Sequence, residues 1–260
     1  ILCFADFLAK RQGMIHTLRD MFPCFIYIGL PVLLVTAQPD LGTALVFIAI
    51  AMGMMFVAGA NPRILVGIIF GALALVVLAL FLHLQFGMWL PLEEYQVKRL
   101  TVFLDPYNDG QGGRGAGWNI IQSLVAIGSG GLIGKGLFQG TQAQLNFLPE
   151  HHTDFIFAVV GEEFGFVGAA LLLLLFAVIL LRAIFIAYNA KDFFSTLTVI
   201  GIISMWLFHI FENVGMSIGL MPITGVPLPF VSYGGSFMLA NMIAVGIILD
   251  INIKGKKIVF

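Results

Sequence analysis

Charged residues are scarce in this chain. Only 10% of its 260 residues are Asp, Glu, Lys or Arg, whereas soluble domains average about 25%. Hydrophobic residues make up 60% of the chain, and the mean hydropathy is +1.02. This deficit argues against an ordinary soluble domain and predicts an integral membrane protein. The net charge of −1 gives no argument for a nucleic acid or another strongly charged partner.

Cysteine is also rare, and an N-terminal targeting signal is missing. The two cysteines, Cys3 and Cys24, have no metal-binding or redox spacing, so we expect them in the core or facing lipid. The chain opens at Ile1 without an initiator Met or the charged segment of a signal peptide. We therefore expect it to be the C-terminal part of a longer protein.

Long apolar runs dominate the rest of the sequence. A membrane-spanning helix needs about 20 apolar residues, with a range of about 17–25. Residues 1–20 are interpreted as the end of an earlier helix followed by a cationic loop. Spans are predicted at residues 21–37, 43–60, 64–92 (with an interfacial end at Trp89), 155–181, 193–211 and 237–249. The predicted fold class is an all-α polytopic membrane protein, with residues 1–260 forming a single integral membrane domain.

Residues 93–153 form one long segment between the predicted spans. It begins with an amphipathic piece at 93–104 and continues with eleven glycines between Gly110 and Gly140. A short helix is predicted at 118–127. A loop of this length in a compact protein is usually functional.

Basic residues predict the orientation of the chain in the membrane. Cytoplasmic loops are enriched in Lys and Arg, and placing the C-terminus inside puts nine of the thirteen basic residues inside. The other four, Lys98, Arg99, Arg114 and Lys135, lie in the long loop. This orientation makes 93–153 a large extracytoplasmic loop and brings it together with Asp40, Asp154 and the Pro-rich residues 221–236.

The most unusual stretch is 148–157, which places Glu150, His151, His152 and Asp154 within five residues. Asp154 is expected in the first turn of the span that follows, where the helix dipole favours an anion. It is a candidate catalytic base, and the alternative is a simple carboxylate at a helix start. Asp40 and Glu212 are expected at the same boundary.

Two further acids, Glu162 and Glu163, fall inside the predicted span that follows Asp154. Ionisable groups at such depth usually face a cavity or a partner. Because the two lie on different faces of the helix, one is expected to line a cavity and the other to be a structural hydrogen-bonding partner. The sequence leaves open which is which.

Metal and nucleotide sites were tested against the motifs. The Glu-His-His-x-Asp cluster lacks the i, i+4 His pair of a zinc hydrolase, and Mg²⁺ or Mn²⁺ held by Asp154 and substrate phosphates is more plausible. Residues 129–136 depart from a P-loop, and 110–115 match a dinucleotide fingerprint only in spacing, with no preceding strand. The glycines are therefore expected to permit close backbone packing, with Lys135 meeting a lipid pyrophosphate.

Several motifs together resemble the SEDS family (shape, elongation, division and sporulation), the group of RodA, FtsW and SpoVE. They are QPDLGT (38–43), GWNIIQS (117–123), AIGSGG (126–131), GKG (134–136), LPEHHTDFIF (148–157), GEEFG (161–165) and GVPLPFVSYGGS (225–236). Residues 140–147 are closer to RodA, and Asn146 stands where FtsW relatives often carry an acid. The resemblance implies a fold of about ten spans, of which this chain holds the last six. A basic residue of the family's proposed active site would precede Ile1.

The resemblance also implies a function. SEDS proteins polymerise lipid II on the outer face of the bacterial cytoplasmic membrane for wall growth, usually with a class B penicillin-binding protein. It assigns the general base of an inverting attack to Asp154, with undecaprenyl pyrophosphate as the leaving group. Further site residues are assigned to substrate binding: Lys98, Arg99, Arg114, Gln122, Lys135, Glu150, His152, Thr153, Ser232, Tyr233 and Ser236. Supporting acids are Asp40, Glu162, Glu163 and Glu212.

Three alternatives remain at this point. A lipid II flippase would use Glu162 and Glu163 along a translocation path, but it would not need a base at an outer helix start. A scaffold would only recruit a synthase, and a division-type FtsW paralogue would share the chemistry. The enzyme interpretation is favoured.

Overall fold

The structure is a computed structural model that describes residues 1–15, 17–38, 40–87, 94–107, 112–115, 117–145 and 147–255. These residues form ten helices and no strand, which confirms the predicted all-α class. The helices are α1 (Leu2–Ala9), α2 (Leu18–Thr36), α3 (Leu41–Val57), α4 (Pro62–Phe86), α5 (Glu94–Leu104), α6 (Trp118–Gly130), α7 (Thr141–Gln144), α8 (Ile156–Tyr188), α9 (Phe193–Ser217) and α10 (Gly235–Gly255). The predictions made for Trp89 and Asn146 lie outside the described residues, as do Lys256 and Lys257, two of the nine basic residues predicted inside.

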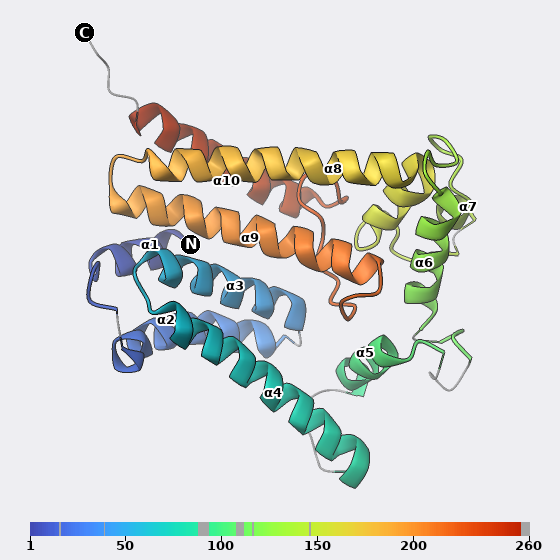
Figure 1. The fold of residues 1–260 in the computed structure, drawn as a ribbon, viewed down its shortest axis with the longest axis horizontal. Coiled ribbons are helices and arrows are strands. Elements are labelled where there is room, and N and C mark those ends of the chain that lie inside the picture. Colours follow the sequence, from blue (N-terminus) through green and yellow to red (C-terminus); the bar gives the residue numbers. More distant parts are fainter. Residues whose placement is uncertain are drawn as a thin grey trace.

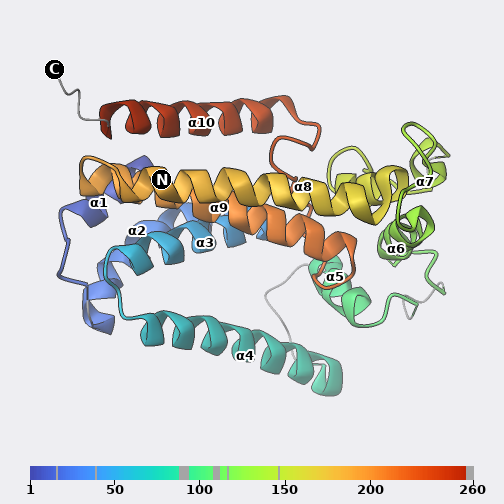
Figure 2. The same ribbon diagram turned by 45° about the horizontal axis from the view of Figure 1, so that its top comes forward.

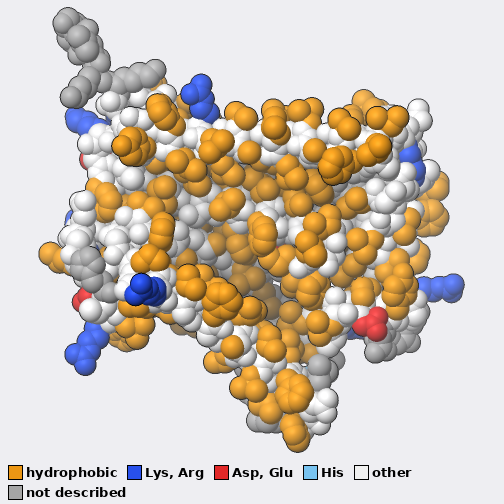
Figure 3. Space-filling view, in the orientation of Figure 1, with side chains coloured by type: hydrophobic (Ala, Val, Ile, Leu, Met, Phe, Trp, Pro, Cys, Tyr) orange, Lys and Arg blue, Asp and Glu red, His pale blue; other side chains and the backbone are white. Residues whose placement is uncertain are grey.

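Six of the helices correspond to the six predicted spans. Helices α2, α4, α8, α9 and α10 are long and apolar enough to cross a bilayer. Helix α3 is a shorter apolar helix of 17 residues, which is about 26 Å long at about 1.5 Å per residue. Figure 3 shows hydrophobic side chains over the middle of the molecule and Lys and Arg mainly toward its two ends. The chain is a multi-pass membrane protein.

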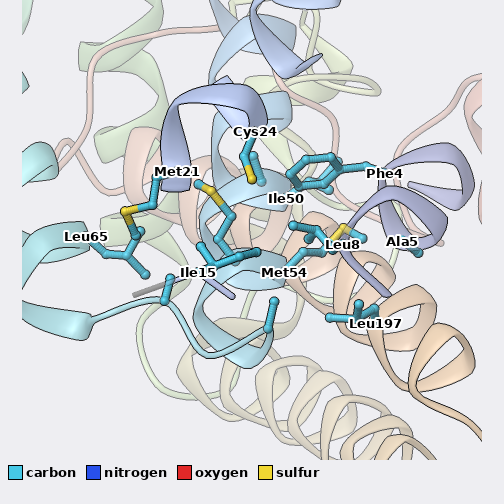
Figure 4. Close-up of a cluster of buried hydrophobic side chains, with 14 of the residues drawn as sticks. Phe4, Ala5, Leu8, Ile15, Met21, Cys24, Ile50, Met54, Leu65 and Leu197 are labelled. Atoms are coloured by element: carbon cyan, nitrogen blue, oxygen red, sulfur yellow. The ribbon is translucent and has the colours of Figure 1, made fainter. Parts of the chain in front are cut away.

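Helix α9 is the centre of the helix assembly. Half of its most apolar 18-residue stretch is buried, whereas only 6% of the corresponding stretch of α4 is buried. Helix α9 packs against α1, α3 and α8 (Figure 1). One core cluster joins α1, α2, α3 and α9 through Leu8, Met21, Met54 and Leu197, as Figure 4 shows. Flexible Met side chains suit the irregular space between helices. In Figure 2, α10 and α4 stand on opposite sides of the α8–α9 layer.

Helix α8 is broken at Gly165, where the sequence predicts an uninterrupted span. Gly165 has φ 66° and ψ −164°, a conformation that residues with a Cβ rarely adopt. Residues 131–136 pair with the break: Phe166 N donates to Gly131 O at 2.9 Å, and Lys135 N donates to Glu162 O at 3.0 Å. The loop thus satisfies backbone groups that the break leaves without helical partners.

Glycines make this contact between loop and helix possible. A Cβ on Gly130 would overlap the carbonyl oxygen of Gly161, and one on Gly134 would overlap that of Glu163. The prediction that the loop glycines permit close backbone packing is confirmed at these two positions.

The predicted grouping at one end of the molecule is also found. We call this the loop end; it holds the Asp40 turn, helices α5 to α7, the start of α8 and residues 218–234 (Figures 1 and 2). The opposite end holds residues 10–15 after α1 and the short connections 58–61 and 189–192. The short predicted helix is present as α6, and the amphipathic piece as α5.

Candidate active site

Asp154 lies in the turn that leads into α8. The helix begins at Ile156 with Phe155 as its N-cap, so Asp154 precedes the first helical turn in which it was predicted. The turn is closed by the carbonyl of Glu150, which accepts from Asp154 N at 3.1 Å. Glu150 itself has φ 52°, a left-handed conformation uncommon for a residue with a side chain. The tight turn displaces Asp154 from the helix start.

Three consecutive carbonyls of this turn are held by the C-terminal part of the chain. His152 O accepts from Tyr233 N at 2.9 Å, and Thr153 O accepts from Ser232 Oγ at 2.6 Å. Asp154 O accepts from the side-chain amide of Asn213 on α9 at 2.7 Å. The backbone of the Asp154 turn is therefore fixed from outside by α9 and by residues 232–233.

The Asp154 carboxyl group is partly buried, and its surroundings favour the protonated form. Burial raises the pKa of this carboxyl above its ordinary value, and the negative charge of Glu150 acts in the same direction. A hydrogen bond from Thr153 and the positive charges of Arg99 and His152 lower the pKa, but by less. The result is a carboxylate that is a stronger base than a solvated Asp.

A pocket of about 310 Å³ lies at the loop end beside this turn. Its lining comes from three elements: Asp40, Leu41 and Leu45 at the start of α3, Gln96, Arg99 and Leu100 on α5, and Pro222, Ile223 and Thr224. Residue 225 follows directly, and a Cβ there would lie 3.3 Å from Asp154 Oδ2. The carboxyl group of Asp154 thus lies next to Gly225, the residue that follows Thr224 in the pocket wall. Arg99 lines the pocket and also acts electrostatically on Asp154.

Asp40 and Glu212 reach this region, as predicted. The Asp40 side chain caps α3, accepting from Thr43 N at 3.0 Å and Thr43 Oγ1 at 2.6 Å. Glu212 is 3% exposed and accepts from Thr224 Oγ1 at 2.8 Å. Asp40 lines the pocket directly, and Glu212 contacts it through Thr224.

Glu162 is a structural partner for the long loop. It is completely buried, and its Oε1 accepts from Lys135 Nζ at 2.6 Å, Thr141 N at 2.8 Å and Thr141 Oγ1 at 2.9 Å. Glu163 is also buried, at 8% exposure, and lies against Gly140. The positive charge of Lys135 is paired with the Glu162 carboxylate. Lys135 is therefore not the exposed cation that the sequence predicted would meet a lipid pyrophosphate.

The remaining predicted residues are spread more widely. Lys98, Arg114 and Ser236 are exposed, and Gln122 is partly buried on α6. Tyr233 is 76% exposed, and its ring packs edge-on against His152 with centroids 5.8 Å apart. Ser232 is buried and bonded to Thr153, so its hydroxyl serves the turn.

Known proteins resemble this chain in sequence. A sequence model of the FtsW/RodA/SpoVE family, described as cell cycle proteins, matches residues 1–257. The chain belongs to this SEDS family.

Individual relatives agree with the SEDS assignment. The chain is 42% identical to the peptidoglycan glycosyltransferase MrdB of Escherichia coli K12, over 93% of this chain and 62% of the relative. It is 41% identical to stage V sporulation protein E of Bacillus subtilis, over 97% of this chain and 65% of the relative. The chain therefore spans less than two thirds of the length of these two relatives.

Solved structures share the fold. One, described as the structural coordination of polymerization and crosslinking by a peptidoglycan synthase complex, matches with a TM-score of 0.75 and 30% identity, over 98% of this chain and 69% of that one. The rod shape determining protein RodA of Thermus thermophilus matches with a TM-score of 0.63 and 26% identity. The match covers 97% of this chain and 62% of that one.

The SEDS motifs meet at the loop end. Motif 148–157 is bonded to motif 225–236 through Ser232 and Tyr233. At the α8 break, motif 161–165 is bonded to motif 134–136, and Phe166, the residue after it, donates to Gly131 O. Segments far apart in sequence thus surround the Asp154 turn.

A metal site was tested on the same residues. Within the described ranges, no group of three or more His, Cys, Asp or Glu side chains is arranged to hold an ion. Mg²⁺ takes octahedral oxygen ligands, so an Mg²⁺ or Mn²⁺ ion at Asp154 would depend on substrate phosphates and water for most of them. The side chains in the described part of the chain do not by themselves supply such a ligand set.

Sequence reasoning missed Asn213, Thr224 and Gln96. Asn213 on α9 donates a hydrogen bond to the Asp154 turn. Thr224, in the 221–234 segment, and Gln96, on α5, line the pocket. One signal was available: Glu212 and Asn213 form an adjacent polar pair in an otherwise apolar span, and buried polar groups require partners.

Proposed function

We propose that the protein is a peptidoglycan glycosyltransferase that polymerises lipid II into glycan strands for cell elongation. The observation that carries the proposal is the partly buried Asp154 carboxyl beside a pocket that contains Arg99, in a chain of the SEDS family. Relatives of the chain are named peptidoglycan glycosyltransferases.

Asp154 acts as the general base. Its carboxylate removes the proton from the 4-hydroxyl of the acceptor sugar while that oxygen attacks the anomeric carbon of the donor with inversion. The raised pKa supports this role, because a base is most effective when its pKa approaches the working pH. The bond from the anomeric carbon to undecaprenyl pyrophosphate breaks, and the leaving group departs with the electron pair.

Positive charge is needed where the pyrophosphate leaves. Arg99 is the best-supported candidate, since it lines the pocket and acts electrostatically on Asp154. Lys98 and Arg114 are exposed in the same loop and are available to an incoming diphosphate. No step is routed through a metal ion.

The lipid tails need an apolar path. A groove of about 260 Å³ lies between α8 and α9, lined almost wholly by apolar residues such as Leu173, Phe211 and Met221. Met221 directly precedes the Pro222 wall of the site pocket. We infer that a polyprenyl chain can occupy this groove while its head group reaches the pocket.

The proposal places the loop end on the outer face of the cytoplasmic membrane. The positive-inside rule supports this orientation, because Lys10, Arg19, Arg63 and Lys191 lie in or beside the connections of the opposite end. We also propose a class B penicillin-binding protein as partner, in line with the complex of polymerization and crosslinking that matches the chain.

Polymerisation in detergent tests the function. The full-length protein, purified with its partner after the partner's crosslinking site has been inactivated, is supplied with lipid II, and glycan products are separated by length. We expect strands to form, because the donor is already activated by its lipid. A flippase or a scaffold forms no glycosidic bond and would yield no glycan products. The absence of glycan products would therefore refute the proposal.

A further inference from the structure

Asn213 occupies an unusual position on the central helix α9. It is fully buried, and its side-chain nitrogen donates to Asp154 O at 2.7 Å and to Val226 O at 2.9 Å. Its Oδ1 atom is buried and has no hydrogen-bond partner among the described residues. An unsatisfied buried polar atom destabilises the folded state, so apolar helix packing alone gives no reason for an amide here.

The neighbouring residue of α9 holds the same segment at a second point. Glu212 accepts from Thr224 Oγ1 at 2.8 Å, two residues before Val226. Thr224 lines the site pocket, and its carbonyl is close enough to α3 that a Cβ on Gly42 would lie 2.9 Å from it. Two adjacent side chains of α9 therefore fix residues 224–226 between α9 and the start of α3.

We propose that Asn213 is a positioning residue for the Asp154 base, with Glu212 holding the pocket wall beside it. We call the pair the α9 clamp. The proposal rests on the proposed function, since it assigns Asn213 a role in the reaction of Asp154. One amide joins the backbone of Asp154 to that of Val226, and residue 225 between Thr224 and Val226 lies next to the Asp154 carboxyl. The clamp therefore sets the distance between the carboxyl and the wall of the pocket.

Small displacements of a catalytic group have large effects on rate. A misplacement of about 1 Å can reduce the rate by about 10²-fold. Loss of the amide frees the Asp154 carbonyl and loosens the turn, although Tyr233 N and Ser232 Oγ still hold His152 and Thr153. The turn is expected to persist with a mobile, better hydrated carboxyl group.

The test compares Asn213→Ala with Ser217→Ala in the full-length protein and its crosslinking-inactive partner. Ser217 lies one turn further along α9, is also fully buried, and donates to Asn213 O at 2.8 Å. Its removal deletes a buried hydrogen bond of the same helix that does not reach the Asp154 turn. Polymerisation of lipid II is measured against substrate concentration and pH.

We expect Asn213→Ala to lower kcat by about 10–100-fold without a matching rise in KM. The acid limb of its pH profile, the pH range over which the rate falls as Asp154 is protonated, moves to lower pH. The reason is that a hydrated Asp154 loses the burial that raises its pKa. Glu150 and His152 on the turn and Arg99 on α5, the charged groups that act on Asp154, are unchanged in this variant. Ser217→Ala keeps the wild-type acid limb.

Two results would overturn the clamp: wild-type kcat in Asn213→Ala, or a lower kcat with an unmoved acid limb as in a purely structural variant. If Asn213→Ala does not fold, Asn213→Leu, which fills a similar volume without a hydrogen-bond donor, is measured with the same two readouts and the same criteria. Asp154→Ala is run in parallel. If that variant polymerises lipid II, Asp154 is not the base and the proposed function fails in its mechanism. If it is inactive while Asn213→Ala behaves as wild type, only the clamp fails.

Discussion

Asp154 is held by its backbone, while its carboxyl group stays close to the site pocket. The carbonyl groups of residues 152–154 accept bonds from Tyr233, Ser232 and Asn213, so the side chain is not needed to anchor the turn. Most capping carboxylates are committed to nearby amides, as Asp40 is to Thr43. This difference separates Asp154, the proposed base, from a capping carboxylate such as Asp40.

The raised pKa of Asp154 predicts the acid side of the pH profile. The carboxylate form is the active base, so the polymerisation rate should fall as the pH drops through a pKa above the ordinary Asp value of about 3.9. Initial rates of the full-length protein across pH, at saturating lipid II, measure this limb. A limb at or below the ordinary Asp range would contradict the burial of the group.

The same shift predicts an effect on stability. A raised folded-state pKa means that the folded protein binds the proton more tightly than the unfolded chain. The stability from this proton is fully present below the unfolded pKa and is lost as the pH rises through the folded pKa. Asp154→Asn, which stays neutral, should therefore melt at the same or a higher temperature than wild type at neutral pH. Thermal unfolding in detergent checks this, and a clearly lower melting temperature at pH 7 would contradict it.

At the scale of elements, α8 follows the Asp154 turn and pairs with the long loop at its break. The sequence predicts its span from the apolar run, but the break at Gly165 depends on backbone pairing with residues 131–136, which are distant in sequence. Periodicity reports which face of a helix is apolar and carries no information about such long-range pairing. Glu162 could be predicted to need a partner, and the identity of that partner, Lys135, depends on the same tertiary contact.

A pair of glycine variants tests the contact between loop and helix. Gly134 has φ +78° and no room for a Cβ beside Glu163 O, whereas a Cβ at Gly128 on α6 would meet nothing within 4 Å. Gly134→Ala should lower the free energy of unfolding by about 1–3 kcal/mol through overpacking, plus backbone strain. Gly128→Ala should be neutral or stabilising, by up to about 1 kcal/mol, because Ala favours helix. Equal melting temperatures for the two variants would show that the loop does not pack into the break.

At the scale of the whole molecule, most of the architecture could be predicted from the sequence. Apolar runs identified six helices, and the basic residues grouped the Asp40 turn, the loop and Asp154 at one end, where the pocket and the hydrogen bonds bring them together. The choice of contacts inside that end could not be predicted. Asn213 and Thr224 act through side-chain bonds to loop backbone, and such bonds depend on the packed positions of both segments.

The proposed orientation predicts which end is reached from outside the cell. In a full-length variant with Cys3 and Cys24 replaced by alanine, single cysteines are placed at Tyr107 of the loop end and at Lys191 of the opposite end, both exposed. A membrane-impermeant maleimide should label Tyr107→Cys on intact cells and Lys191→Cys only after permeabilisation. The reverse pattern would place Asp154 on the cytoplasmic side and contradict the proposed reaction.

The most direct test of the central claim is the rate of glycan polymerisation by Asp154→Asn in the full-length protein with its crosslinking-inactive partner. The matched control is Asp105→Asn, an exposed carboxylate of the same loop that caps Tyr107 N at 3.1 Å. With Asp154 as the base, the rate should fall by about 10²–10⁴-fold while lipid II still binds, and the control should retain the wild-type rate. Polymerisation at the wild-type rate by Asp154→Asn would contradict the account.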